Sequence, residues 1–357
     1  MNTNTFAPVR IGIAGLGRLG RRHAENLVSR VPGAALVAAA DPVAANRDWA
    51  RTLGVANVYE DLPALLAHPE LEAVWLVTPT TLHADQMITV LEAGKHVFCE
   101  KPLALEVADC ERVIAVARQR PAQVAMVGFM RRLDPGNVEA KRLLDAGELG
   151  EPFHIHLDSH DPVDPNGYFV RYAPTSGGLF LDCAIHDADL LRWLLDAAEP
   201  VRVSAAGSRR LYPDLAACDD IDTGVVTIEF DTGVIGTISV SRTSHRGYEA
   251  ALQVHGTRGA VRAGYSLSPL PVVCEGGDAR HTAGLPDFYA RFDVAFLRET
   301  EAFVTAVRNG TPSPLTLENA CEATRLAVAM RDALQQHATL TLPPGTSNRT
   351  SEAAENK

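Results

Sequence analysis

Three ionisable residues are spaced along one short segment near the middle of the chain. Asp182, His186 and Asp189 lie four and three residues apart, so on a helix they share one face. Histidine titrates near neutral pH and a neighbouring carboxylate can fix its tautomer, which is the chemistry of a general base. The same spacing suits a helix cap at Asp182 and a structural histidine, so the spacing alone leaves both interpretations open. Without a second histidine at a fixed spacing, a metal site is the weaker interpretation.

A lysine follows a short apolar run in the segment Glu100-Lys101-Pro102, directly after residues 96–99. If that run is a strand of an open parallel sheet, Lys101 lies beyond its carboxyl end, where ligands of such sheets bind. An ammonium there can hold a hydroxyl and stabilise a developing alkoxide. A surface lysine in a turn that ends at a proline is the alternative interpretation.

Two further groups of polar residues are open to more than one interpretation. Arg131 and Arg132 follow another expected strand end and could meet a polar substrate or a cofactor, or form a solvated basic turn. His154, His156 and His160 occur at alternate positions near a strand, which places them on one sheet face without making them converge. We therefore interpret these histidines as structural or substrate-facing, and we predict no metal site.

A glycine-rich turn near the start of the chain predicts a dinucleotide site. Gly15-Leu16-Gly17-Arg18-Leu19-Gly20 lies between an expected strand at 9–14 and an expected helix at 18–31. In this pattern the first glycine permits a tight turn, the second lets the backbone approach a pyrophosphate, and the third lets the helix pack closely. The helix amino terminus then attracts the phosphates. Asp41 follows the next apolar run, about 20 residues after the last glycine, where a carboxylate accepts hydrogen bonds from a ribose.

The carboxylate of Asp41 also bears on the choice of cofactor. It would repel a 2′-phosphate and suits the free ribose hydroxyls of NAD. Arg47 lies nearby in the sequence and could partly offset that repulsion. NAD is therefore the predicted cofactor, with NADP left open.

Hydrophobic periodicity divides the chain into two parts. The first alternates strands and helices and predicts a doubly wound parallel sheet, with strands at 73–77, 96–99 and 124–127 and helices at 43–53, 62–67, 83–93 and 106–120. The second predicts a sheet covered by helices on one face, with strands at 153–157, 201–207, 225–230, 234–240 and 250–254 and helices at 289–308 and 317–337. Asp231-Thr232-Gly233 is an expected hairpin turn.

Length and composition set limits on the kind of protein. The 357 residues suggest about two domains, and a net charge of −11 argues against a nucleic-acid partner. No apolar run reaches membrane-spanning length, and residues 1–8 lack the apolar core of a secretory signal. The six cysteines are scattered, with no Cys-x-x-Cys pair, which predicts free thiols and a cytoplasmic protein.

Taken together, the glycine turn, Glu100-Lys101-Pro102, and Gly177-Gly178 followed by Asp182-x-x-x-His186 resemble the Gfo/Idh/MocA oxidoreductase family. The resemblance spans residues 9 to about 342. Three other segments are most similar to the inositol 2-dehydrogenase branch of that family, namely 128–132, 176–180 and 287–292.

The resemblance implies a fold and a domain division. It implies a Rossmann doubly wound parallel sheet followed by an α/β domain with a large, mostly antiparallel open sheet that serves in oligomerisation, often as a homotetramer. We place the dinucleotide-binding domain at 1–128, the substrate-binding and oligomerisation domain at 129–345, and a disordered tail at 346–357. It also implies that the Lys101–Pro102 peptide bond is often cis.

The resemblance further implies an activity and a set of site residues. The implied activity is NAD-dependent oxidation of a cyclic polyol, with myo-inositol oxidised to an inosose as the first choice. Oxidation of scyllo-inositol or a sugar is the alternative, and a non-enzymatic dinucleotide sensor is the weakest. The implied catalytic residues are Lys101, Asp182 and His186, and the substrate contacts add Arg131, Asp161, Asp189 and Tyr248. Some relatives carry Asn at the position of Asp161 and Thr at that of Cys183. The predicted cofactor contacts are Gly15, Leu16, Gly17, Arg18, Leu19, Gly20, Asp41, Thr78, Pro79, His83, Glu100, Lys101 and Arg131.

Overall fold

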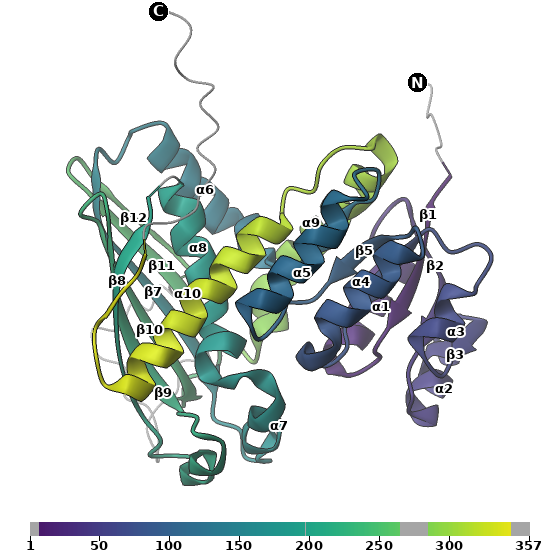
Figure 1. Ribbon diagram of the computed structural model, residues 1–357, viewed down its shortest axis with the longest axis horizontal. Coiled ribbons are helices and arrows are strands. Elements are labelled where there is room, and N and C mark those ends of the chain that lie inside the picture. Colours follow the sequence, from purple (N-terminus) through teal and green to yellow (C-terminus); the bar gives the residue numbers. More distant parts are fainter. Residues whose placement is uncertain (1–6, 197, 265–284, 344–357) are drawn as a thin grey trace, which may run out of the picture.

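The computed structural model describes residues 7–196, 198–264 and 285–343, and the tail predicted at 346–357 lies outside them. Two sheets form the frame of the molecule, one in each half (Figure 1). The fold class predicted from the sequence is confirmed, because a six-stranded parallel sheet is followed by a mostly antiparallel sheet of seven strands. No helix within these described ranges is both long and apolar enough to cross a bilayer.

The first sheet has the strand order β3-β2-β1-β4-β5-β6 and is parallel throughout. Because the order reverses between β1 and β4, right-handed crossovers place α1 and α2 on one face and α4 and α5 on the other. The elements are β1 Val9–Ala14, α1 Arg18–Ser29, β2 Ala34–Ala40, α2 Ala44–Thr52, β3 Asn57–Tyr59, α3 Leu62–Leu66, β4 Ala73–Leu76, η1 Thr80–Leu82, α4 His83–Glu92, β5 His96–Cys99, α5 Val107–Arg118, β6 Ala125–Val127 and η2 Met130–Leu133.

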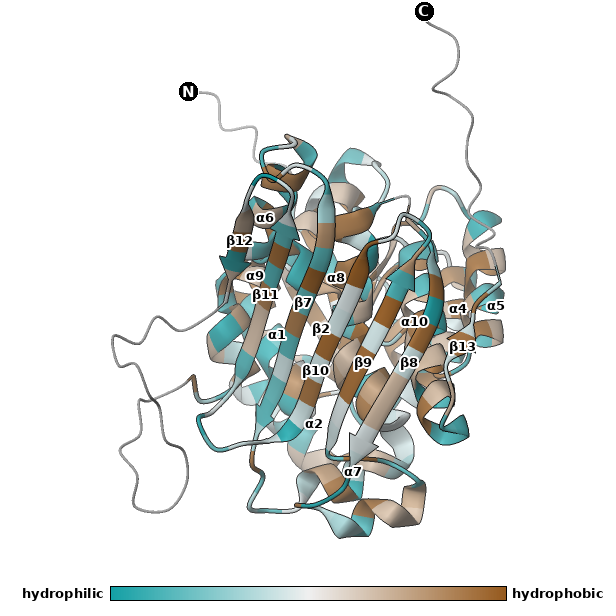
Figure 2. Ribbon diagram, turned by 90° about the vertical axis from the view of Figure 1, so that its left-hand side faces the viewer, coloured by the Kyte–Doolittle hydropathy of each residue, from teal (hydrophilic) through white to brown (hydrophobic). Residues whose placement is uncertain are grey.

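The second sheet has the order β12-β11-β7-β10-β9-β8-β13, with β7 and β10 as its one parallel pair. Figure 2 shows this sheet face-on, with the helices behind it. The elements are α6 Pro135–Asp145, β7 Pro152–Pro162, α7 Tyr168–Ser176, η3 Phe180–Ala184, α8 Ile185–Leu195, β8 Pro200–Ser208, η4 Pro213–Cys218, β9 Thr223–Phe230, β10 Ile235–Ser244, β11 Glu249–Gly256, β12 Ala260–Ala263, α9 Phe288–Asn309, α10 Leu317–Gln336 and β13 Leu340–Thr341. The expected turn at 231–233 joins β9 to β10, with Gly233 at a φ of +85°.

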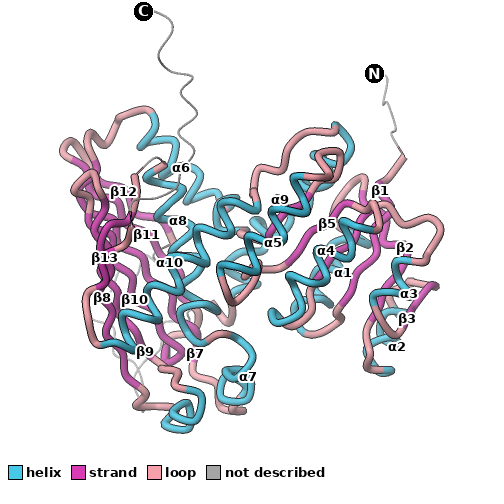
Figure 3. Tube along the Cα trace, viewed as in Figure 1, coloured by secondary structure: helices cyan, strands magenta, loops and turns pink. Residues whose placement is uncertain are grey.

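One face of the second sheet is closed and the other is open. Along β7, Ile155 and Leu157 point into the core, whereas His154 and His156, which alternate with them, are partly exposed. Helices α8 and α10 cover the closed face (Figure 3). The partly exposed side chains, which alternate with the buried ones along β7, lie on the open face.

The last two long helices connect the halves. Phe303 on α9 and Leu317 on α10 belong to the core around the first sheet, while Leu326 and Met330 further along α10 belong to the core of the second. Residues after 129 thus contribute to both cores. The division at residues 128 and 129 stays a prediction.

Candidate active site

The glycine-rich turn has the local geometry that its sequence predicts. Gly15 has a φ of +93°, and a Cβ there would come within 2.3 Å of the Val77 carbonyl oxygen. A Cβ on Gly20 would come within 2.0 Å of the Gly15 carbonyl oxygen, so the helix packs on the turn as closely as a glycine allows. A Cβ on Gly17 would meet nothing within 4 Å, so the backbone there faces open space. No side chain caps α1 at Gly17, which leaves its first N–H groups available to an anion.

Asp41 lies at the end of β2 and is tied to this turn. Its Oδ2 accepts the backbone N–H of Leu16 at 2.7 Å, and its Oδ1 accepts the N–H of Val43 at 2.8 Å and Nδ2 of Asn46 at 3.1 Å. A carboxylate offers about four acceptor positions, so capacity remains for a ribose hydroxyl. Arg47 donates to the backbone carbonyls of Asp41 and Pro42, which holds its guanidinium to the main chain.

The loops after β4 and β5 are joined by one buried histidine. Nδ1 of His83 lies 2.7 Å from the carbonyl oxygen of Pro102, and Nε2 lies 2.8 Å from that of Thr78. Burial lowers the pKa of His83. The Lys101–Pro102 peptide is cis, as the resemblance implied.

One cavity of about 780 Å³ runs from the glycine turn to the second sheet, a size suited to a cofactor with a small substrate. It brings together residues from at least seven elements and their loops. Of the predicted site residues it is lined by Gly15, Gly17, Arg18, Leu19, Gly20, Asp41, Thr78, Pro79, His83, Glu100, Lys101, Arg131, Asp161, Asp182, His186 and Tyr248.

Lys101 and Asp182 meet in this cavity, although 81 residues separate them. Nζ of Lys101 donates to the Asp182 carbonyl oxygen at 2.5 Å and lies 3.3 Å from its Oδ1. Burial opposes the charged form of Lys101, but the Asp182 carboxylate, together with smaller contributions from Tyr172, Cys183 and Glu100, outweighs burial and raises the pKa of the lysine. The ammonium is therefore charged at neutral pH and acts as a hydrogen-bond donor.

Asp182 has a second cationic partner in Arg242. The guanidinium Nη2 of Arg242 lies 2.7 Å from Asp182 Oδ2, and its Nη1 lies 3.2 Å from Asp220 Oδ2. Burial works in the opposite direction, but Lys101 and Arg242 together lower the pKa of Asp182. The carboxylate is held ionised between two positive charges.

His186 lines the same cavity from the first turn of α8 and packs edge-on against the ring of Phe129. Burial lowers its pKa well below the usual range, and the charges of Arg131 and Lys101 add to that effect. Its Nδ1 has no partner among the described residues. A neutral imidazole beside a charged ammonium is the combination that a hydroxyl deprotonation requires.

Arg131 is held in the wall by three side chains. Nη1 donates to Asp187 Oδ1 and to Ser159 Oγ, both at 2.7 Å, and Nη2 donates to the Tyr248 hydroxyl at 3.2 Å. Burial, offset in part by Arg131, raises the pKa of Tyr248 to about 12. Tyr248 therefore stays a neutral hydroxyl in the cavity.

Asp161 and Cys183 form a polar patch in the cavity wall. The Cys183 thiol lies 3.4 Å from Asp161 Oδ2. Burial raises the pKa of Asp161, and the charge of Asp182 adds to the rise while Arg242 opposes it. Both residues line the cavity beside Asp182.

Two predicted contacts do not reach the cavity. Asp189 is buried and makes a two-pronged ion pair with Arg132, through Nε at 2.7 Å and Nη2 at 2.5 Å, so its carboxylate is occupied away from the site. Leu16 points its side chain into the core, and its N–H is bonded to Asp41.

His154 and His156 both bond the Thr237 hydroxyl on the partly exposed sheet face and do not line the cavity.

Sequence reasoning missed two residues of this site. Arg242 comes from β10 and is fully buried, and a charged residue within an otherwise uncharged strand was the available signal. Tyr172 lines the cavity from α7, a helix that the sequence did not predict because Pro174 lies inside it. Burial raises the pKa of Tyr172 to about 12, and the charge of Asp182 adds to that effect.

The fold and the cavity together define a dinucleotide-binding oxidoreductase with a second, mostly antiparallel sheet. The chain belongs to the Gfo/Idh/MocA family: the family model described as "Oxidoreductase family, NAD-binding Rossmann fold" matches residues 9–129, and that of the family's C-terminal domain matches 137–262.

Similar proteins include three with informative names. A scyllo-inositol 2-dehydrogenase (NAD(+)) of Bacillus subtilis is 39% identical over 85% of this chain and 87% of its own length. A myo-inositol 2-dehydrogenase of Thermotoga maritima is 33% identical over 92% of this chain and 97% of its own. A crystal structure of scyllo-inositol dehydrogenase from Lactobacillus casei with bound NAD(H) and scyllo-inositol matches with a TM-score of 0.85 and 34% identity, over 94% of this chain and 99% of that one.

Proposed function

We propose that the protein oxidises one ring hydroxyl of an inositol to a ketone, with NAD as the hydride acceptor. The observation that carries this proposal is that Lys101 and His186 line one cavity with the glycine-rich turn. The names of the inositol dehydrogenases to which the chain is similar support the choice of substrate class.

In this proposal the chain's own residues handle the proton and the developing charge. His186, kept neutral by its surroundings, takes the proton of the reacting hydroxyl. Lys101 donates a hydrogen bond to the same oxygen and offsets its growing negative charge. Asp182 holds the ammonium in place. Hydride leaves readily only from an alkoxide-like carbon, so these groups must act on one oxygen together.

The residues present fit a dinucleotide. The open space at Gly17 and the uncapped start of α1 suit a pyrophosphate, and Asp41 suits an adenosine ribose. NAD, when bound, supplies the hydride acceptor. The remaining predicted contacts, including Thr78, Pro79 and Glu100, line the cavity between that turn and Lys101.

Two inositol isomers are candidate substrates. Myo-inositol is the choice made from the sequence, whereas the relative of 39% identity carries the name of a scyllo-inositol dehydrogenase. Asp161 and Cys183 line the cavity beside Asp182, and we propose that they distinguish the two orientations of a ring hydroxyl.

A spectrophotometric screen tests the proposal. Myo-inositol, scyllo-inositol and glucose are each offered with NAD and with NADP, and the formation of NADH or NADPH is followed. We expect turnover of at least one inositol with NAD, and a loss on the order of 10²-fold or more in Lys101→Met. Lys141→Met is the matched control, because Lys141 pairs with Asp145 on α6, away from the cavity. Turnover of glucose alone, or unchanged turnover in Lys101→Met, rejects the proposal.

We also propose that the protein assembles through the open face of the second sheet, as a homotetramer, and that it works in the cytoplasm. Val225 and Ile235 on that face are 53% and 43% exposed, so the open face offers apolar side chains that a second copy could cover. Cys99, Cys110, Cys183, Cys218 and Cys321 are free thiols, which suits a reducing compartment. Light scattering of the wild type and of Val225→Glu tests the assembly. A wild-type monomer contradicts it.

A further inference from the structure

A group of three buried ionisable side chains lies next to Lys101, and one of its members, Glu100, also lines the cavity. It consists of His23 from α1, Glu100 at the end of β5 and Glu299 from α9, which we call the buried triad. The exposed fractions of these residues are 1%, 5% and 0%. One nitrogen or oxygen from each lies within 4.8 Å of the other two. Glu299 takes no part in the function proposed above.

The hydrogen-bond donors around the buried triad are unevenly shared. Oε1 of Glu100 lies 2.8 Å from Nε2 of His23, and Oε2 accepts the backbone N–H of Lys101 at 3.1 Å. Since an ionised carboxylate only accepts, Nε2 of His23 carries the hydrogen. Glu299 has no hydrogen-bond partner on either oxygen among the described residues. Glu100 therefore has two hydrogen-bond donors, whereas Glu299 has none among the described residues.

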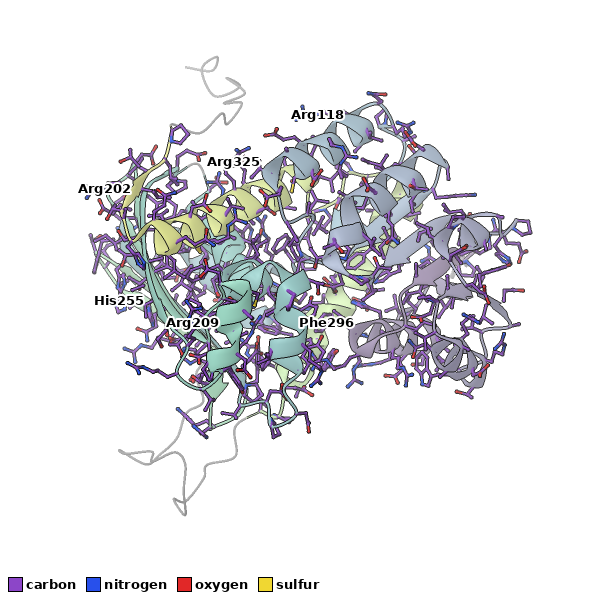
Figure 4. All side chains as sticks on the ribbon, turned by 60° about the horizontal axis from the view of Figure 1, so that its bottom comes forward. Arg118, Arg202, Arg209, His255, Phe296 and Arg325 are labelled. Carbon is purple, nitrogen blue, oxygen red and sulfur yellow. The ribbon has the colours of Figure 1, made fainter. Side chains whose placement is uncertain are left out.

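The surroundings make an ionised Glu299 unfavourable. The ring of His23 lies 5.8 Å from that of Trp75, 5.7 Å from Phe98 and 5.6 Å from Phe296. Phe296 lies where the two halves of the molecule meet (Figure 4). Burial raises the pKa of Glu299 well above its usual range, and the charge of Glu100 adds to the rise. An unpaired charge in such a place is strongly disfavoured, so the group takes up a proton instead.

Other titratable groups face Glu100 from the neighbouring elements. Its charge acts on His83 at the start of α4, Cys99 on β5, Lys101 after β5, Tyr289 on α9 and Glu299 itself. Of these, Glu299 is the carboxyl group whose oxygen lies within 4.8 Å of a Glu100 oxygen, and its neutral form can donate to Glu100 while the two N–H bonds remain. Each Glu100 oxygen has a further lone pair for that donor.

We propose that Glu299 is a neutral carboxylic acid that keeps its proton and donates a hydrogen bond to Glu100, directly or through one water, and thereby positions the Lys101 loop. Glu299 is then a positioning residue, since Glu100 and not the substrate is its partner. The proposal rests on the proposed function only where it concerns Lys101 and turnover. The protonation state of Glu299 stands apart from that function.

The link from Glu100 to Lys101 is short and stiff. Glu100 bonds the N–H of the next residue, so a fixed carboxylate fixes the peptide from which the ammonium extends. The backbone at Gly128 also closes on it, because a Cβ there would lie 2.9 Å from the Phe98 ring and 3.3 Å from the Glu100 carboxyl. A Glu299 oxygen lies within 4.8 Å of a Glu100 oxygen, which leaves Glu299 close enough to act on the same carboxylate.

Three variants separate the possible roles of Glu299. Glu299→Gln keeps the shape and one donor of a neutral acid, whereas Glu299→Leu removes the donor. Glu301→Gln is the matched control, because Glu301 is an exposed glutamate two residues further along α9. If Glu299→Leu does not fold, the other two variants still decide the matter.

The protonation state is measured without any assay of activity. The infrared spectrum of the full-length wild type at neutral pH is expected to contain the carbonyl stretch of a protonated carboxylic acid that is missing in Glu299→Gln and present in Glu301→Gln. The melting temperature gives a second measurement. The folded state keeps a proton that the unfolded state releases, so the wild type should lose stability relative to Glu299→Gln as pH rises above the ordinary glutamate range.

Turnover then tests the positioning role. We expect Glu299→Gln to stay within a few-fold of wild type and Glu299→Leu to lose about tenfold in kcat, the scale of one misplaced hydrogen bond. The KM for the substrate should change little, because Glu299 does not line the cavity. Absence of the acid band, or one equivalent of bound metal in the purified protein, overturns the proposal. If no substrate is turned over, the infrared and melting results still decide the state of Glu299 and only the proposed function fails.

Discussion

Nη2 of Arg242 lies 2.7 Å from Oδ2 of Asp182, while the ammonium of Lys101 lies near the other oxygen of the same carboxylate. Arg242 is fully buried and also pairs with Asp220. The arginine therefore supports the ionised form of the carboxylate that holds Lys101. It does so from a strand of the second sheet, behind the cavity wall.

Replacing Arg242 should move the acidic limb of the pH profile. In Arg242→Met, one of the two charges that lower the pKa of Asp182 is gone, so Asp182 takes up a proton at a higher pH than in the wild type. We expect kcat/KM for the inositol to begin falling at correspondingly higher pH. Initial rates across the pH range, with exposed Arg142→Met as the control, measure this.

Stability must be followed in the same experiment. Removing one member of a buried ion pair costs about 3–5 kcal/mol, because the partner charge is left uncompensated. Arg242→Lys keeps the positive charge, so the acidic limb of its kcat/KM profile should lie between those of the wild type and of Arg242→Met. An unshifted limb in a folded Arg242→Met protein would show that Asp182 does not need this arginine.

His186 should support activity below the usual titration range of histidine. Its pKa is lowered, so the imidazole stays neutral as pH falls through 6.5 and protonates only further down. We expect wild-type kcat/KM to show no loss centred near 6.5. His186→Asn should lose on the order of 10²-fold or more in kcat, the scale of a general base.

His337→Asn is the matched control for His186. His337 is an exposed residue that ends α10 in a left-handed conformation, which asparagine adopts readily. A wild-type pH profile of kcat/KM that falls near or above pH 6.5, with that fall missing in His186→Asn, would contradict the role of His186 as a base that stays neutral.

Asp41 should control the choice between the two nicotinamide cofactors. Asp41→Ser removes the charge that repels a 2′-phosphate, and the hydroxyl can still accept one of the backbone N–H groups. We expect kcat/KM with NAD to fall about tenfold, the scale of a hydrogen bond to a charged group, while that with NADP rises. Asp48→Ser on the exposed side of α2 is the control. An unchanged NAD to NADP ratio in Asp41→Ser would remove Asp41 from this role.

The sequence predicted the parts of the site that depend on local spacing. The glycine turn, Asp41 and the position of Lys101 after β5 follow from rules that act over a few residues, and the structure has them in those places. Arg242 could not be placed in the same way, because its pairing with Asp182 spans 60 residues and two elements. The partners of a buried charge are set by tertiary packing, which periodicity does not describe.

Spacing in the sequence predicted that Asp182, His186 and Asp189 share one helix face. That prediction holds for Asp182 and His186, four residues apart, but not for Asp189, seven residues from Asp182. Asp182 and His186 line the cavity together, as four-residue spacing predicts. The segment Phe180–Ala184 is a π-helix, whose wider turn rotates the residues that follow relative to an ideal α-helix. Asp189 therefore meets Arg132, and Asp187 meets Arg131 at the cavity wall.

This rotation gives the last prediction, which separates Asp189 from Asp161. Asp189→Asn should destabilise the protein by about 3–5 kcal/mol, because it leaves the buried Arg132 guanidinium without its counter-charge. The KM for the inositol should stay unchanged in whatever protein remains folded, since Asp189 does not line the cavity. Asp161→Asn should do the reverse, with a changed KM and a smaller loss of stability, because Asp161 lines the cavity beside Cys183. Denaturant unfolding and steady-state kinetics of both variants make the comparison. A stable Asp189→Asn protein with a raised KM would restore Asp189 as a direct substrate contact.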